Sequence, residues 1–239
     1  MKKILFSLMA LVCSMSMNAQ IIKVMKNGQA DPVATYTGSE YYVVFEEQTA
    51  PTTTGTAKAT IAGSEVDVNW VQLWENGPKF AEYNIGAVNN KAEDYGNYYC
   101  WGSSINKDSD GAYKDGESAL SGVDDTATNL WGSNWRMPTQ AEFQTLLDNC
   151  DVEWTTVNGV NGRKFTGKEA YASNSVFFPA AGYCNYGNVD FQGMIGGYWS
   201  STPYNSNSAF DLYFNAGGQS AYADSRNFGK SVRAVLAEE

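Results

Sequence analysis

The sequence predicts an α+β fold that is rich in β-strands and has one or two helices, and three observations support this prediction. Glycine accounts for 23 of the 239 residues, and Asn-Gly pairs recur where tight turns would join strands. Apolar and polar residues alternate within residues 197–235, which is typical of half-buried strands. Hydrophobic residues make up 43% of the chain, enough to build the core of one main domain.

Residues 1–19 are typical of a secretory signal peptide, so we expect the protein to be secreted or held at the cell surface. Two lysines form a basic start, and residues 4–12 form an apolar run that is too short to span a bilayer. Ala19 provides a small residue before the expected cleavage point. Lipid anchoring at Cys13 is the less favoured alternative, because Val12 is bulky for the position before a lipoprotein cysteine.

Residues 20–50 are predicted to form a small β appendage. Strands at residues 21–25 and 41–45 would pair with each other, but so short a segment buries little surface alone. Residues 51–57 combine proline, glycine and several threonines, a composition that favours a linker. The main domain is therefore expected to cover residues 58–239.

The main domain is expected to begin with strands at residues 66–74 and 79–85, followed by a short aromatic strand at residues 97–101. The most clearly marked helix starts at a capping box formed by Thr139 and Glu142. An apolar stripe at helical spacing follows, made of Ala141, Phe143, Leu146 and Leu147. We expect this helix to end at the next cysteine in the sequence.

Three more strands are expected before the C-terminal segment. Residues 152–157 and 163–166 would pair across a turn at residues 158–162, which contains two Asn-Gly pairs. Residues 176–183 have the apolar density of a central core strand, which Pro179 would end.

The C-terminal segment alternates a fixed set of apolar residues with tyrosines and small polar residues. Tyrosine, serine and asparagine are the residues that antibody binding surfaces favour, because they provide contact area and adaptable hydrogen bonds. If the apolar residues face the core, the others face solvent together. The candidate ligand-binding residues are Tyr204, Asn205, Asn207, Asp211, Tyr213, Asn215, Ser220, Tyr222, Asp224 and Asn227. The three tyrosines are the first choices, since aromatic residues dominate binding surfaces of this kind.

Composition excludes several classes of function. The formal net charge of -10 disfavours binding to nucleic acid, and we expect no insertion into a membrane. The chain has no histidine, which excludes Ser-His-Asp and Cys-His sites and zinc held by histidine. Beyond the leader, Cys100, Cys150 and Cys184 allow either one disulfide and a thiol or three buried thiols.

Residues 106–117 resemble a calcium-binding loop. Carboxylate and amide oxygens at alternate positions, with a later glutamate, can surround a hard cation; the candidate ligands are Asn106, Asp108, Asp110 and Glu117. The alternative is an acidic, solvated loop, because the helices that flank an EF-hand loop are missing from the pattern. No other cofactor is expected.

Several further residues have a structural interpretation. Arg136 and Arg233 lie in apolar surroundings, where a guanidinium group binds carbonyls or an acid and holds loops on the core. Residues 124–125 are expected to cap a short helix that ends near Leu130. The tryptophans expected in the core rather than on a sugar-binding surface are Trp131, Trp135 and Trp199.

Five motifs follow one another within residues 66–235: YGNYYCWG at 95–102, WGSNWRMPT at 131–139, FPAAGY at 178–183, YWSS at 198–201 and SVR at 231–233. Together they resemble the Fibrobacter succinogenes major paralogous domain, a family common in exported proteins of Bacteroidetes. That family is similar to the formylglycine-generating-enzyme branch of the C-type lectin fold. The resemblance therefore implies a C-type-lectin-like main domain.

Some relatives in this family are variable proteins of diversity-generating retroelements, in which adenine-rich codons near the 3′ end of the gene are rewritten. Such codons start from asparagine and mutate to tyrosine, serine, aspartate and alanine, the residue types found in the C-terminal segment here. The resemblance implies a secreted, non-enzymatic adhesin or receptor-like protein with a variable surface. Its partner would be a protein or glycan on another cell, a phage or a host surface.

Two alternatives remain. One is a structural subunit of a surface or fimbria-like assembly that polymerises through residues 20–50. The other is an unrecognised enzyme: the formylglycine-generating relatives bind copper through two cysteines close together in sequence, whereas Cys150 and Cys184 are far apart here. This difference favours a protein without catalytic residues.

Overall fold

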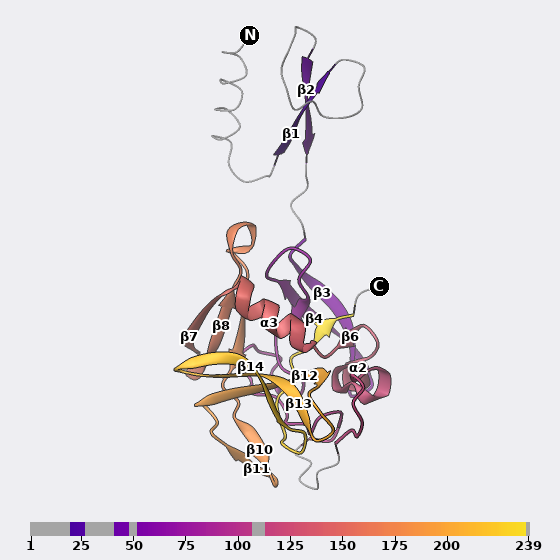
Figure 1. Cartoon of the computed structure of the whole chain (residues 1–239), viewed down its shortest axis with the longest axis vertical. Coiled ribbons are helices and arrows are strands. Elements are labelled where there is room, and N and C mark those ends of the chain that lie inside the picture. The colour runs from indigo at the N-terminus through magenta and orange to yellow at the C-terminus, as the bar shows by residue number, and fades with distance from the viewer. Residues whose placement is uncertain (1–19, 27–40, 48–51, 107–112, 238–239) are drawn as a thin grey trace. The chain divides into compact units, whose positions relative to one another are not determined.

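The computed structural model describes residues 20–26, 41–47, 52–106 and 113–237 (Figure 1). Contacts within the chain divide it into two units, Met1–Thr52 and Thr53–Glu239. The expected signal peptide and Cys13 lie outside the described residues. None of the helices in the described ranges is long and apolar enough to cross a bilayer.

The described residues of the first unit form one antiparallel pair of strands. β1 (Gln20–Lys26) pairs with β2 (Tyr41–Glu47) along their full lengths, from Gln20 opposite Glu47 to Lys26 opposite Tyr41. The two strands expected from the sequence are therefore confirmed, each with a few more residues than predicted.

The second unit begins with a five-stranded sheet of order β3-β4-β5-β15-β6. Its strands are β3 (Thr54–Ile61), β4 (Ser64–Gln72), β5 (Lys79–Ala81), β15 (Val235–Leu236) and β6 (Trp135–Arg136). The sheet thus joins the start of the domain to its C-terminal end, which lie far apart in sequence but side by side in Figure 1.

The linker predicted at residues 51–57 is shorter than expected, because its last four residues, 54–57, belong to β3. Threonine favours strands, and Gly55 brings β3 close to Trp70: a Cβ atom at this glycine would lie 2.7 Å from the indole ring. The strand expected at residues 79–85 ends at Ala81. The aromatic strand expected at residues 97–101 is reduced to one bridge between Tyr99 and Lys230.

A second, three-stranded sheet has the order β7-β8-β9. β7 (Asp151–Val157) and β8 (Val160–Thr166) form a hairpin, and β9 (Ser175–Pro179) ends at its proline as predicted. The expected five-residue turn is wrong: the hairpin turns through two residues, Asn158 and Gly159, both with positive φ. An Asn-Gly pair suits such a two-residue turn, so the next residues remain in β8.

The third sheet carries the C-terminal segment. It consists of β12 (Ile195–Pro203), β13 (Ser208–Asn215) and β14 (Gly218–Ser225), all antiparallel. A small hairpin of β10 (Tyr183–Asn185) and β11 (Asn188–Asp190) precedes it. In Figure 1 these five strands occupy the lower part of this unit.

Two α-helices and two short 3₁₀ turns occur in the described residues. α2 (Thr126–Trp131) is capped by the Asp125 carboxylate, and α3 (Gln140–Asn149) begins at the predicted capping box and packs against β12, β13 and β14. The 3₁₀ turns are η1 (Gly122–Asp124) and η2 (Glu169–Tyr171). The predicted α+β class, mostly β, is therefore confirmed.

Two large groups of buried side chains form the core. The first contains the three tryptophans expected there, and Trp131 and Trp135 meet edge to face with ring centroids 5.4 Å apart. The second is rich in phenylalanine and joins α3 to the second and third sheets through Phe143, Phe165 and Phe214. Both groups hold β12 and β13 firmly, so the exposed side of the third sheet rests on a rigid base.

Candidate functional site

The third sheet presents a surface that we call the tyrosine face, formed by Tyr213, Ser220, Tyr222 and Asp224. Side chains alternate between the two sides of a strand, and the strand register places Tyr213 opposite Ser220. The rings of Tyr213 and Tyr222 lie with their centroids 6.3 Å apart, tilted by 54°. Tyr222 is 57% exposed, so this pair offers aromatic surface to a partner.

Tyr204 belongs to a different surface. Its backbone N–H bonds to the Ser208 carbonyl, and its ring packs edge to face on Phe210, with centroids 5.3 Å apart. Phe210 points to the opposite side of β13 from Tyr213, because the two residues are three positions apart. The prediction that all three tyrosines share one surface is therefore wrong.

The β12–β13 turn forms the second exposed group, which we call the tip; it consists of Tyr204, Asn205, Ser206 and Asn207. All four residues are exposed. The Asn205 side-chain oxygen accepts hydrogen bonds from the N–H groups of Asn207 (2.9 Å) and Ser208 (2.8 Å), which fixes the turn. The tip is thus an ordered, polar end of the sheet.

Asp211 does not face solvent, and that prediction is corrected. It lies on the same side of β13 as Tyr213, but it is fully buried, because Lys230 covers it from the segment that follows β14. The Lys230 ammonium contacts Asp211 Oδ2 at 2.5 Å and Asp224 Oδ2 at 2.8 Å, and it lies 4.7 Å from the centre of the Trp199 ring. Burial raises the pKa of Asp211 against the opposing effect of Lys230.

The remaining predicted residues are half-buried. Asn215 caps the β13–β14 turn, since its side-chain oxygen accepts from the N–H groups of Gly217 and Gly218. Asn227 has a buried side-chain oxygen, and its carbonyl accepts a hydrogen bond from the Cys100 thiol. Both residues shape the backbone more than they extend toward a partner.

Arg226 holds the tip in place, a role that the sequence pattern did not reveal. It is fully buried, and its guanidinium group lies 4.1 Å from the centre of the Trp101 ring. It donates to the carbonyls of Asn205, Ser208, Lys114 and Gly116. The only sequence signal is a lone arginine within a run of small polar residues, a pattern equally typical of an exposed side chain.

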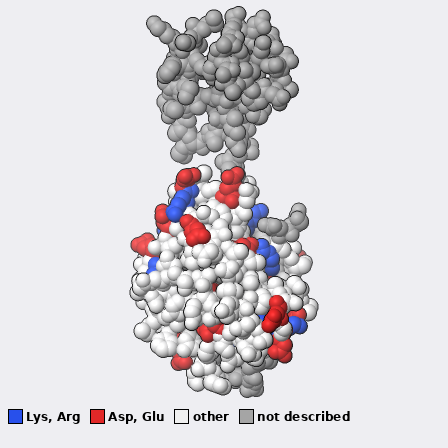
Figure 2. Space-filling model, viewed as in Figure 1, with Lys and Arg blue, Asp and Glu red and all other residues white. Residues whose placement is uncertain are grey.

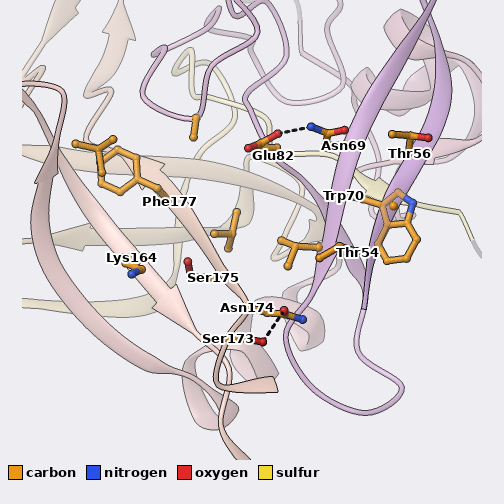
Figure 3. Close-up of a pocket in the computed structure, with 15 residues that line it drawn as sticks. Thr54, Thr56, Asn69, Trp70, Glu82, Lys164, Ser173, Asn174, Ser175 and Phe177 are labelled. Carbon is orange, nitrogen blue, oxygen red and sulfur yellow. Dashed lines mark hydrogen bonds between the residues drawn. The ribbon is translucent and has the colours of Figure 1, made fainter. Parts of the chain in front are cut away.

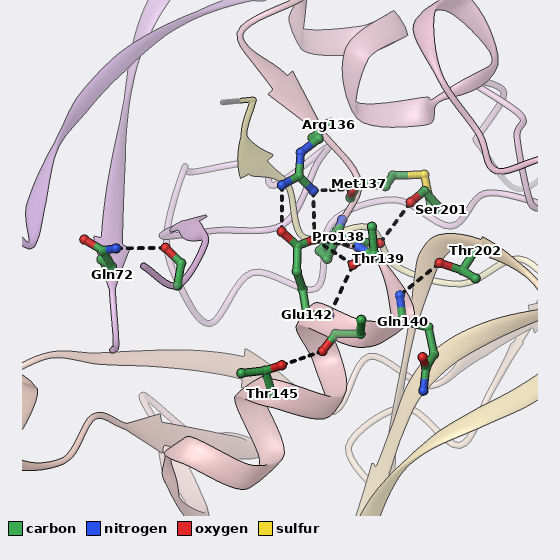
Figure 4. A network of polar contacts seen from close by, with 12 residues as sticks. Gln72, Arg136, Met137, Pro138, Thr139, Gln140, Glu142, Thr145, Ser201 and Thr202 are labelled. Carbon is green, nitrogen blue, oxygen red and sulfur yellow. Dashed lines mark hydrogen bonds and ion pairs between the residues drawn. The ribbon is translucent and has the colours of Figure 1, made fainter. Parts of the chain in front are cut away.

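Arg136 and Arg233 have the structural role that was predicted. Arg136 forms a two-pronged ion pair with Glu142, whose carboxylate also accepts from the Thr139 N–H (Figure 4). Burial raises the pKa of Glu142, but the Arg136 and Thr139 donors outweigh it, so its pKa lies below the usual value. Arg233 is buried and donates to three backbone carbonyls.

The predicted calcium loop falls largely outside the described residues, because Asp108 and Asp110 both lie there. The Asn106 side-chain oxygen accepts from the Tyr98 N–H at 3.1 Å, and Glu117 is exposed. Within the described ranges, no group of three or more acidic or cysteine side chains is arranged to hold a metal. Calcium binding stays a prediction.

A pocket of about 660 Å³ lies between the first and second sheets, and no sequence pattern indicated it. Trp70 comes from β4, and Lys164 and Phe177 from β8 and β9 (Figure 3). The Asn69 side-chain amide donates a hydrogen bond of 2.8 Å to the Glu82 carboxylate, so these two polar groups already have partners within the protein. Segments far apart in the sequence build the pocket, so local sequence patterns could not reveal it.

The charge distribution around the third sheet favours polar and aromatic contacts. Figure 2, drawn in the same view as Figure 1, shows charged side chains mainly along the margins of this unit, while its centre, over β12–β14, is mostly uncharged. Uncharged hydrogen-bonding groups with aromatic rings suit protein or glycan surfaces.

Comparison with known proteins places most of the chain in one family. Residues 74–236 match the family model described as the Lcl C-terminal domain. No curated protein and no solved structure matches the chain. The match spans the second and third sheets, both helices and the whole C-terminal segment, whereas β3 and β4 of the first sheet precede it. Because it covers more than two thirds of the chain, this protein belongs to the Lcl C-terminal domain family.

Proposed function

We propose that this protein is a secreted or surface-held, non-enzymatic binding protein that recognises a protein or glycan through its third sheet. The observation that carries the proposal is the ring contact between half-buried Tyr213 and exposed Tyr222 on a sheet anchored in the core. Tyrosine gives a large contact area at low entropic cost and adds a hydroxyl group for hydrogen bonds. Membership of the Lcl C-terminal domain family favours a surface-type protein.

The tip provides a second contact region in this proposal. Tyr204 is 61% exposed, and Asn205 and Asn207 offer amide groups beside it. Because the tip and the tyrosine face lie on opposite sides of β13, a ligand that contacts both must wrap around the end of the sheet. Two separate partners would use the two surfaces independently.

Retroelement diversification belongs to the same proposal, together with a C-type-lectin-like fold. Five of the predicted variable positions are exposed: Tyr204, Asn205, Asn207, Ser220 and Tyr222. A residue that varies must not disturb the core, and substitutions at exposed positions change stability little. A reverse-transcriptase gene beside this gene, with a near-copy of its 3′ end that differs only at adenines, would support diversification; absence of both would remove it.

The binding proposal is tested with labelled protein on intact bacterial cells and on an immobilised glycan panel. We expect the double variant Tyr213→Ala, Tyr222→Ala to lose affinity by at least about tenfold for any surface that the wild type binds. The control variant is Tyr186→Ala, which removes a tyrosine that is 76% exposed on the β10–β11 connection. Full binding by the double variant would contradict the proposed site.

A further inference from the structure

Lys230 and Asp211 are held against each other by two different parts of the chain. Asp211 lies in the middle of β13, paired with Trp199 on one side and Tyr222 on the other. Lys230 lies beyond β14, where its N–H and C=O both bond to the Tyr99 backbone at 2.9 Å. Neither backbone can move away without breaking strand pairing, so the two side chains meet in one fixed arrangement.

Their reactive atoms are in contact and are shielded from water. Lys230 Nζ lies 2.5 Å from Asp211 Oδ2, and the two side chains are 2% and 0% exposed. The Trp199 ring lies 4.7 Å from Nζ, and the carbon chain of Lys230 passes over Gly197, where a Cβ atom would lie 3.2 Å from it. Attack on a carbonyl carbon needs this kind of close, oriented contact.

Asp211 is poorly satisfied as a carboxylate. No hydrogen-bond partner for its buried Oδ1 occurs among the described residues. A buried charge with an unmet acceptor is unfavourable, and burial accordingly raises the pKa of this carboxyl group despite the facing ammonium. Transfer of a proton from Nζ to Oδ2 would replace two buried charges by a neutral amine and a neutral acid.

Asp224 completes the group. Its Oδ2 lies 2.8 Å from Nζ, so it can accept a proton from the nitrogen and return one to a departing oxygen. The Asp224 side chain is 32% exposed, whereas Lys230 and Asp211 are enclosed. Asp224 therefore lies on the side of the group from which a released water molecule could reach solvent.

We propose that Lys230 and Asp211 condense to an intramolecular isopeptide bond, with Asp224 as the proton carrier. The neutral Nζ attacks Asp211 Cγ, an N–C bond forms and a C–O bond breaks. One nitrogen proton passes through Asp224 to the leaving hydroxyl group, and one water molecule is released. The step needs no oxidant, reductant or co-reactant, and it removes both buried charges. The inference does not depend on ligand binding.

The bond would lock the sheet that carries the tyrosine face. It joins β13 covalently to the segment at residues 229–231, which bridges to Tyr99, Cys184 and Tyr198. Pulling on the end of the chain would then load a covalent link instead of hydrogen bonds alone. Such a link suits a protein that holds a partner under mechanical force.

Peptide mapping of the purified full chain tests the proposal directly. Trypsin should fail to cut after an acylated Lys230, so residues 227–233 should appear joined to residues 169–226, at a mass one water below the sum of the two peptides. Fragmentation of the joined species should locate the link at Lys230 and Asp211. Recovery of only separate peptides, with cleavage after Lys230, would overturn the proposal and leave an ion pair.

Three variants separate the roles of the residues. Lys230→Arg keeps a positive charge, and Asp211→Ala removes the reacting carbon; neither should show the mass loss. Asp224→Asn keeps both reacting groups and should remain largely unlinked after the same incubation. Efficient linkage in Asp224→Asn would overturn the assigned role of Asp224, and a mass loss in Lys230→Arg would overturn the assigned bond. The wild-type result stands even if a variant does not fold.

Discussion

Arg233 donates a hydrogen bond of 2.8 Å to the side-chain oxygen of Asn84, and both residues are fully buried. The Asn84 amide in turn donates to the Tyr95 carbonyl and the Tyr198 hydroxyl. Arg233 also donates to the carbonyls of Ala81 at the end of β5, of the residue after it, and of Phe177 in β9. One guanidinium group thus bonds to the first and second sheets directly, and through Asn84 it is linked to Tyr198 in the third.

Arg233→Lys should reduce the free energy of unfolding by about 3 kcal/mol or more. Lysine cannot present the planar set of donors, so buried carbonyls and the Asn84 oxygen lose their partners. Urea unfolding followed by tryptophan fluorescence measures the change. Lys58→Ala, which breaks an exposed ion pair with Asp67, should leave the unfolding midpoint almost unchanged. Equal effects of the two variants would contradict this assignment.

Thr139→Ala should destabilise the protein by about 1 kcal/mol, because the Glu142 N–H loses the side-chain acceptor that caps α3. Thr139→Ser keeps the hydroxyl group and should recover most of the loss. Chemical unfolding of the three proteins side by side provides the measurement. If serine were as harmful as alanine, packing of the threonine methyl group would explain the effect instead of capping.

Glu142→Gln should be less stable than the wild type at neutral pH, and the difference should shrink under acid conditions. The pKa of Glu142 is lower in the folded than in the unfolded protein, so its stabilising effect is complete above the usual glutamate pKa. That effect is lost as the pH falls below about 4 and through the folded-state pKa. Unfolding free energies of both proteins across this range test the prediction; a constant difference would contradict it.

Cys150 should react slowly with iodoacetamide in the folded protein and quickly in denaturant. The residue is 5% exposed, and burial raises the pKa of its thiol to about 12, so little thiolate forms at mildly alkaline pH. Mass spectrometry of the peptide that contains Cys150 follows the reaction over time. Similar rates in the two conditions would show that the end of α3 opens readily.

Features set by neighbouring residues were predictable. The capping box of Thr139 and Glu142 depends on contacts within one helical turn, and the end of β9 follows from the missing N–H of Pro179. Errors arose where composition was ambiguous. Thr54 and its neighbours had linker composition, yet packing of Trp70 against Gly55 makes them a strand.

The site was predicted only in part, for a related reason. Alternation along β13 placed Tyr213 and Asp211 on one side of the strand, and that much followed from local geometry. The pattern could not show that Lys230, nineteen positions along the chain, would cover one of them and leave the other accessible. Nor could it place Tyr204 with Phe210 on the far side of the sheet.

From the order of its residues alone, this chain specifies a β-rich α+β domain, its helix starts, its core tryptophans and a C-terminal run suited to contact. Folding in three dimensions settles which members of that run reach solvent, how Arg226 and Arg233 hold them, and where Lys230 meets Asp211. Capping and strand alternation act between residues a few positions apart, whereas burial depends on segments brought together from opposite ends of the sequence.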